Sequence, residues 1–179
     1  VAAIANAQGI YTLNAGTVLS PFLTTLGDAV NSTGTVAIVS GQFIATNDLT
    51  KIGNFGSGIL NQTGGTSSFS FFSLGDNFGG LGTVNISGGQ LTVTPSVATD
   101  VTRIGNYGTA KFNISGGIVW LRGELHIADN TPATGDVLVT GGHLISTNDL
   151  VAIGRYGVGT FTITNATAVF TNTSVGRHD

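Results

Sequence analysis

Apolar and polar residues alternate in short segments that recur along this chain. The clearest segments are Val84–Ser87 and Phe112–Ser115, in which every second residue is apolar. A period of two is typical of a β-strand that buries one face and exposes the other. A Gly-Gly pair follows both segments and favours a tight corner, because glycine adopts positive φ at no steric cost. We therefore predict a strand and then a sharp turn in each unit.

Two further strands complete the unit. A second apolar segment follows the Gly-Gly pair, as in Leu91–Val93 and Val119–Leu121, and a third segment ends on the Ile of Ile104-Gly105-Asn106. No stretch shows the periodicity of an amphipathic helix. Each unit is thus predicted to contain three short strands, joined by turns into a three-sided coil.

The unit returns about every 24 residues. The spacing is 24 or 25 residues except for one of 28, which we attribute to an insertion near Thr94–Ala98. The opening residues of the units are Gly9, Gly34, Gly58, Gly82, Ala110, Gly135 and Gly159. A second landmark, an aliphatic residue followed by Gly or Ala, keeps the same order at Leu26, Ile52, Leu74, Ile104, Ile127, Ile153 and Val175. A fixed period in this range predicts stacked repeats.

The period selects the fold class. A unit of 24 residues is too short for a propeller blade, which needs roughly 40 residues, but it suits one coil of a parallel β-helix. We therefore predict an all-β, right-handed parallel β-helix (solenoid) of about seven coils, with the hand taken from the general preference of parallel crossovers. Residues 9–179 form this single domain. Residues 1–8 are either an apolar N-terminal strand or the remnant of a processed secretory signal.

The alternation also divides the first strands into an inner and an outer face. The residues predicted to be buried are Val84, Ile86, Phe112, Ile114, Val137, Val139, Phe161 and Ile163. Those predicted to face outward are Asn85, Asn113, Leu138 and Thr162.

The repeat is similar to known sequences at Ile104–Gly108 and Phe112–Gly117. These segments resemble the Gly-rich β-solenoid repeats of bacterial surface proteins, namely autotransporter passenger repeats and repeats of proteins with a PEP-CTERM sorting signal. The resemblance extends over nearly the whole chain from Gly9. It implies a passive extracellular stalk or scaffold that is secreted or held at the cell surface.

Composition narrows the set of partners. Charged residues make up 8% of the chain and the net charge is −3, without a basic run, so nothing favours binding to nucleic acid or to an anionic membrane. No stretch of about 18 apolar residues is present, so we expect no membrane insertion.

The sequence offers few candidate catalytic residues. Asp48, Asp100 and Asp149 occupy similar places in their units and represent the only candidate carboxylate face, but Asn-Asp more often fixes a turn through its side chain. His126, His143 and His178 lack metal-ligand spacing. We therefore expect no enzyme activity, no metal and no cofactor.

Six Asn residues lie in Asn-x-Ser/Thr and are candidate N-glycosylation sites: Asn31, Asn61, Asn85, Asn113, Asn165 and Asn172. Of these, Asn61, Asn85 and Asn113 share one place in consecutive coils, where we favour a stacked Asn ladder over glycan acceptors. Asn31 and Asn172 are the better acceptors because they lie in less regular stretches.

An aromatic residue recurs in the corner after the second landmark, at Phe55, Tyr107 and Tyr156, with Phe78 nearby. Such a column, if exposed, would bind sugars by stacking. We favour the alternative, a packed aromatic stack.

Two functions of different class follow. The first is a non-catalytic extracellular structural subunit that stacks head to tail on copies of itself, with the segment Val1–Leu13 docking near Thr160–Val175 of the next copy. The expected contacts are Val1, Ile4, Ile10, Leu13, Phe161, Ile163, Val169 and Val175. The alternative is a carbohydrate-binding or polysaccharide-processing β-helix, with glycans as partners.

Overall fold

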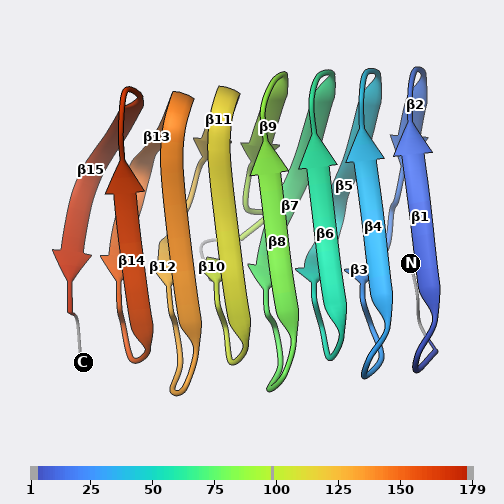
Figure 1. Cartoon of the computed structure of the whole chain (residues 1–179). Helices are drawn as coiled ribbons and strands as arrows, with labels where there is room; N and C mark the ends of the chain where they lie inside the picture. The colour runs from blue at the N-terminus through green and yellow to red at the C-terminus, as the bar shows by residue number, and fades with distance from the viewer. Residues whose placement is uncertain (1–3, 98, 177–179) are drawn as a thin grey trace.

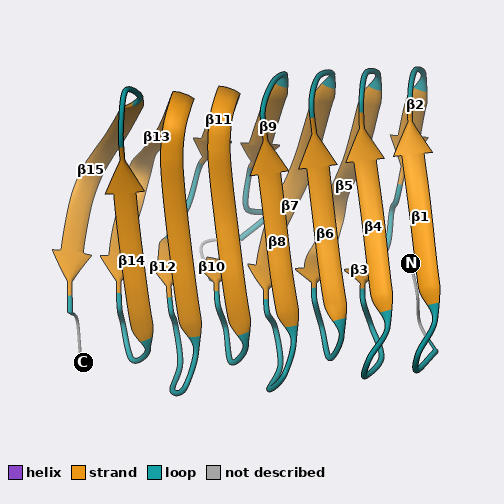
Figure 2. Ribbon diagram, viewed as in Figure 1, coloured by secondary structure: helices purple, strands orange, loops and turns teal. Residues whose placement is uncertain are grey.

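The chain folds entirely into strands, turns and loops over the residues that the computed structural model describes, 4–97 and 99–176 (Figure 2). All its strands belong to one 15-stranded sheet with parallel pairing. In chain order the strands are β1 Gln8–Leu13, β2 Thr17–Leu19, β3 Thr24–Leu26, β4 Thr33–Ile38, β5 Gln42–Ile52, β6 Ser57–Gln62, β7 Thr66–Leu74, β8 Leu81–Ile86, β9 Gln90–Val93, β10 Thr102–Ile104, β11 Thr109–Leu121, β12 Leu125–Ile127, β13 Thr134–Ile153, β14 Val158–Ile163 and β15 Thr167–Val175.

The sheet winds into a parallel β-solenoid of about seven turns, with roughly 24 residues per turn. In Figure 1 the first strands of the coils rise side by side in a near layer, and the chain descends through a far layer. The coils advance in chain order from one terminus to the other. The predicted fold class is confirmed, while the right-handed sense stays the expectation that the crossover preference supplies.

Both sequence landmarks stack in register. The opening Gly34 pairs with Gly9 on one side and with Gly58 on the other, and this column continues through Gly82, Ala110, Gly135 and Gly159. The second landmark forms another column, from Leu26 through Ile52 to Val175. Like residues therefore lie above one another along the whole solenoid.

The two columns depend on each other through close backbone contact. A Cβ atom on Gly82 would overlap the backbone around Leu74 and Gly75, and a Cβ atom on Gly53 would overlap the backbone at Leu81. Gly53 also has a φ of +78°, which disfavours any other residue. Glycine recurs at both landmarks because two backbone segments meet there.

The coils are less three-sided than the sequence predicts. In β5, β7 and β15 the second and third strands run together as one strand with only a local irregularity, such as the register shift between Ala45 and Leu49. This stretch contains no glycine in β5, so the chain bends there without a sharp corner. β11 and β13 even continue through the Gly-Gly corner.

The apolar core lies between the layers and runs the length of the solenoid. Phe72 and Phe112 meet edge to face at its centre, with ring centroids 6.0 Å apart. One polar side chain, Gln62, lies in an inward column and is fully buried, yet it bonds to Ser67 and to the carbonyl oxygens of Gly65 and Gln90. A buried polar group with its partners made costs little stability.

Most of the predicted inner face is confirmed. Val84, Ile86, Phe112, Ile114, Val137 and Val139 are buried, and the outward residues Asn85, Asn113, Leu138 and Thr162 are not. The prediction is wrong for the last coil, where Phe161 is only half-buried and Ile163 is 43% exposed. Both point inward, but no further coil lies on their open side.

Packing predicts a contrast between neighbouring residues. Ile114→Ala should lower the free energy of unfolding by about 2–5 kcal/mol, because it empties a fully buried site. Asn113→Thr should cost only about 0.5–1.5 kcal/mol, the value of its hydrogen bond to Asn85. Denaturant unfolding of the two variants measures this difference, and equal midpoints would show that the inward and outward rows are assigned wrongly.

Candidate functional site

The N-terminal end of the solenoid is an open coil. Among residues 4–97 and 99–176, β1 pairs only with β4, and β2 and β3 pair only with β5, so one edge of each strand carries backbone groups without a strand partner. Such edges are templates for pairing with another strand. Tyr11, which pairs with the buried Val36, is an inward residue that remains 38% exposed.

A recess of about 330 Å³ opens into the core at this end. It is lined by Tyr11, Val18, Leu19, Ser20, Leu23, Thr24, Thr25, Val36 and Phe43. Val36 and Phe43 belong to the second coil, so the first coil leaves the core of the second partly reachable. The recess is one coil deep and mostly apolar.

The C-terminal end is open as well. Within the part of the chain that the structure describes, β14 and β15 pair only with β13. Phe161 and Phe170 form an edge-to-face pair, with centroids 5.2 Å apart, on the inner side of this last coil. Val175, which pairs with Ile153, is 75% exposed. One end therefore has a recess in its core, and the other end has an aromatic pair at the matching place.

The predicted contact residues fall into three groups. Phe161, Ile163 and Val175 occupy inward rows at the open end, as expected. Ile10 and Val169 instead lie on outward rows, which register beside Thr35 and Ile145 respectively. The sequence predicts Ile10 as a contact residue, but the inward position of this strand is held by Tyr11.

The remaining contact residues lie at the N-terminus. Leu13 is buried within the first coil, and Val1 lies outside the described residues. Ile4 is exposed in a turn closed by a hydrogen bond from the Ala7 amide to the Ile4 carbonyl. Residues 4–7 therefore form a turn and not the predicted strand.

The Asn ladder is confirmed. The side-chain amide of Asn85 donates to Asn61 at 2.8 Å, and that of Asn113 donates to Asn85 at 2.8 Å. The nitrogens that would carry a glycan on Asn85 and Asn113 are engaged in this ladder. Glycosylation stays a prediction, and Asn31, Asn165 and Asn172 are the sequons with exposed side chains.

A charged network that the sequence patterns above do not predict surrounds Asp129. Arg103 Nε donates to Asp129 Oδ2 at 2.7 Å, and Arg155 Nη1 donates to Oδ1 at 3.0 Å. His126 Nδ1 lies 2.8 Å from the same Oδ1, and its Nε2 lies 3.0 Å from Glu124 Oε2. Both ring nitrogens of this buried histidine are occupied, so the arrangement ties three coils together rather than exposing a catalytic base.

These ion pairs set the acidity of two buried carboxyl groups. Burial by itself raises the pKa of Asp129, but hydrogen bonds from His126 and Arg155 and the nearby charges outweigh it and hold the pKa well below its usual range. Burial also opposes ionisation of Asp76, and there Lys51, at 2.8 Å, together with Asn106 lowers the pKa. Both carboxylates are therefore ionised structural partners.

The candidate catalytic carboxylates bond to nearby backbone amides, and Asp48 and Asp149 lie at register shifts within β5 and β13 rather than in turns. Asp48 and Asp149 each accept a hydrogen bond from the next backbone amide, and Asp100 accepts two from Ser96 and Val97. Asp100 and Asp149 do line one shallow groove with Arg122 beside the insertion, whereas Asp48 does not line it.

Of the other histidines, His143 is exposed in the column of Gln42 and Gln90, and His178 lies outside the described residues. Within residues 4–97 and 99–176, no group of three or more His, Cys, Asp or Glu side chains is placed to hold a metal ion. The same residues form no helix long and apolar enough to cross a membrane.

The corner aromatic residues differ from the favoured interpretation. Phe55, Phe78 and Tyr107 are exposed, although Phe78 and Tyr107 touch, with centroids 5.2 Å apart. Tyr156 is half-buried beneath the guanidinium of Arg155. The corner is therefore an exposed aromatic edge and not a packed stack.

No family model matches the chain, and neither does any curated protein or solved structure. What the chain does must therefore follow from its own surfaces.

The network around Asp129 predicts acid sensitivity. Because folding lowers the pKa of Asp129, its ionised form stabilises the fold above the unfolded value of about 3.9, and this contribution is lost as the pH falls through the folded value. Asp129→Asn should reduce the difference in urea midpoint between pH 7 and about pH 3.

Asp149→Asn is the matched control, since the Asp149 side chain is exposed and accepts a hydrogen bond from the adjacent amide of Leu150. This variant should keep the pH dependence of the parent chain. An unchanged pH dependence in Asp129→Asn would show that the network adds nothing to stability.

Proposed function

We propose that this chain is a non-catalytic extracellular structural protein, a β-solenoid subunit that stacks head to tail on copies of itself into a fibre or stalk. The single observation that carries the proposal is the pair of open ends. Each end presents unpaired strand edges and inward apolar residues without a covering coil.

The ends match in register. Gly159 extends the column of opening glycines that begins at Gly9, so the first coil of the next copy would continue the series. This register sets Phe161 over Tyr11 and Ile163 over Leu13. Phe170 would enter the recess beside Ser20. Contact between two different surfaces is heterologous and extends without limit unless rotation closes it.

Charge also favours stacking. The strands of the first and last coils, within residues 8–26 and 158–175, contain no Asp, Glu, Lys, Arg or His, and Asp28 lies in the turn after β3. Proteins commonly block exposed strand edges with charged side chains, Lys above all. The edges of this solenoid lack that protection, whereas the coils between them hold the ion pairs.

The rest of the molecule suits a passive role. The buried His126 is held on both sides, and the candidate carboxylates Asp48 and Asp149 accept hydrogen bonds from the adjacent backbone amides. The resemblance to repeats of exported bacterial proteins supports an extracellular or surface location. Regularly stacked coils that are joined by hydrogen-bond ladders form a stiff rod rather than a pocket.

The test uses one blocked end at a time. Tyr11→Asp places a charge on the N-terminal end, and Ile163→Asp places one on the C-terminal end. Thr12→Asp and Thr162→Asp are matched controls on the adjacent outward rows. The two controls should assemble like the parent chain in light scattering, while each blocked variant alone should stay monomeric.

Mixing decides the direction of stacking. An equimolar mixture of the two blocked variants should form dimers and nothing larger, because one free N-terminal end meets one free C-terminal end. A blocked variant that dimerises by itself would show a like-to-like contact. A parent chain that stays monomeric at every concentration would contradict self-stacking and leave further coils of a longer polypeptide as the partner of these ends.

A further inference from the structure

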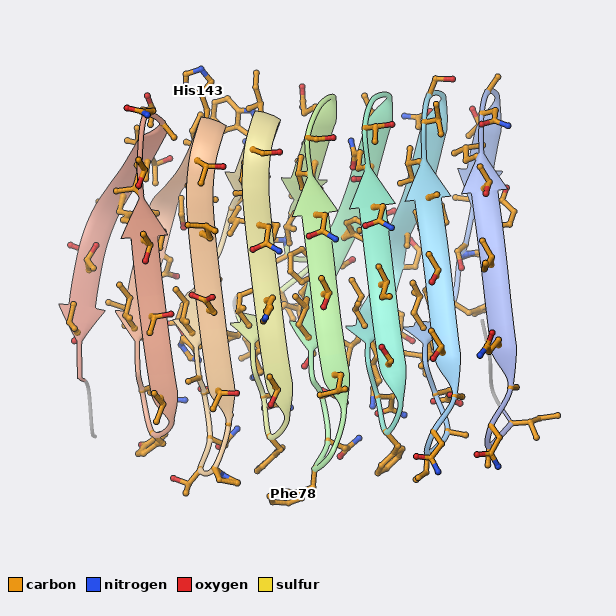
Figure 3. The ribbon with its side chains drawn as sticks, viewed as in Figure 1. Phe78 and His143 are labelled. Atoms are coloured by element: carbon orange, nitrogen blue, oxygen red, sulfur yellow. The ribbon has the colours of Figure 1, made fainter. Side chains whose placement is uncertain are left out.

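One edge of the solenoid carries a row of exposed aromatic rings. Phe55, Phe78 and Tyr107 lie in the turns that lead from one coil to the next, in three consecutive coils, and Phe78 is 64% exposed. Figure 3 shows Phe78 projecting from this edge, opposite the edge that carries His143. An exposed apolar patch of this kind is typical of a binding surface.

The turns beneath the rings are held by side-chain hydrogen bonds. Asn54 donates to Asp28 at 2.7 Å, Asn77 donates to Asn54 at 2.6 Å, and Asn106 donates to Asp76 at 3.0 Å. Each of these Asn residues directly precedes a ring of the row. The backbone that carries the rings is therefore fixed before any partner arrives, which lowers the entropy cost of binding.

A groove of about 340 Å³ accompanies the row. It is lined by Val30, Asn31, Ser32, Thr33, Phe55, Gly56, Ser57, Phe78, Gly79 and Leu81. The groove is lined by a mixture of apolar and uncharged polar side chains. Among the described residues that line the groove, none is Asp, Glu, Lys, Arg or His. A charged partner would find no counter-charge in this groove.

We propose that this aromatic edge binds an uncharged, extended polysaccharide that lies along the solenoid axis. The C–H faces of pyranose rings pack on aromatic faces, and their hydroxyl groups match amide and hydroxyl side chains such as those of Asn31 and Ser57. The 5.2 Å between the rings of Phe78 and Tyr107 is close to one sugar unit of an extended β-linked chain. Successive coils stack about 4.8 Å apart, so the turns that carry the rings recur along the edge at a similar interval.

The edge is independent of the open ends, so a stacked fibre would present it once per subunit. Many weak sites on one rod bind a long polymer far more tightly than a single site does. This activity would turn a passive stalk into one that holds a glycan matrix.

The experiment measures binding of cellohexaose and chitohexaose by calorimetry, with the α-linked maltohexaose as the bent-chain control. The parent chain should bind an extended oligosaccharide more tightly than maltohexaose. Phe78→Ala combined with Tyr107→Ala should weaken that binding at least tenfold. Phe22→Ala, which removes an even more exposed ring away from the edge, and Phe78→Tyr should stay within twofold of the parent.

Light scattering of the same variants separates this proposal from self-stacking, because the double variant should assemble like the parent chain. Failure of the parent chain to bind either extended oligosaccharide would overturn the proposal. So would equal binding by the double variant. A double variant that assembles less than the parent would assign the edge to a second copy of the chain, and would overturn it too.

Discussion

Everything in this structure depends on parallel backbone pairing between successive coils. Each coil offers the next a row of N–H and C=O groups, and the pairing runs without a break in register at the opening column, from Gly9 to Gly159. The glycines at the two landmarks allow this because backbone meets backbone at Gly53 and Gly82. Once the register is set, apolar residues stack on apolar residues and Asn stacks on Asn, so core and surface ladders are consequences of one constraint.

The same constraint leaves one strand edge unpaired at each end of the solenoid. A coil that pairs on both sides is satisfied, whereas the first and last coils each expose one unpaired edge among the described residues, and their strands contain no Asp, Glu, Lys, Arg or His. The ion pairs formed by Asp129 lie in the interior coils, where Asp129 joins Arg103 to Arg155. The rod is therefore held together by ion pairs in its interior coils and has unpaired strand edges at its ends, which is the physical basis for the proposed stacking.

The sequence predicts the coils well because register is a property of spacing. The repeat aligns Gly34, Gly58 and Gly82 at one position, and the structure pairs them. The predictions are wrong where the spacing of the repeat does not by itself determine whether a residue is buried. Phe161 has an inward position but no neighbour above it, so burial fails at an end even though orientation is right. Ile10 was chosen for its apolar side chain, although aligning it with Thr35 marks it as outward and identifies Tyr11 as the inward residue.

Contacts that depend on side-chain conformation are harder to predict from the sequence than the register is. Asp129 and Arg155 occupy the same place after the second landmark, so their proximity could be read from the alignment, but the closure of His126 onto both Asp129 and Glu124 depends on rotamers. The exposure of Phe78 likewise depends on how its turn projects from the edge.

Amide hydrogen exchange, followed by mass spectrometry across a range of protein concentrations, tests the central claim most directly. If unpaired edges drive assembly, protection of β1 and of β14 and β15 should rise with concentration, while β8, already paired on both sides, should not change. Exchange at β1 and β14 that is independent of concentration would contradict the account.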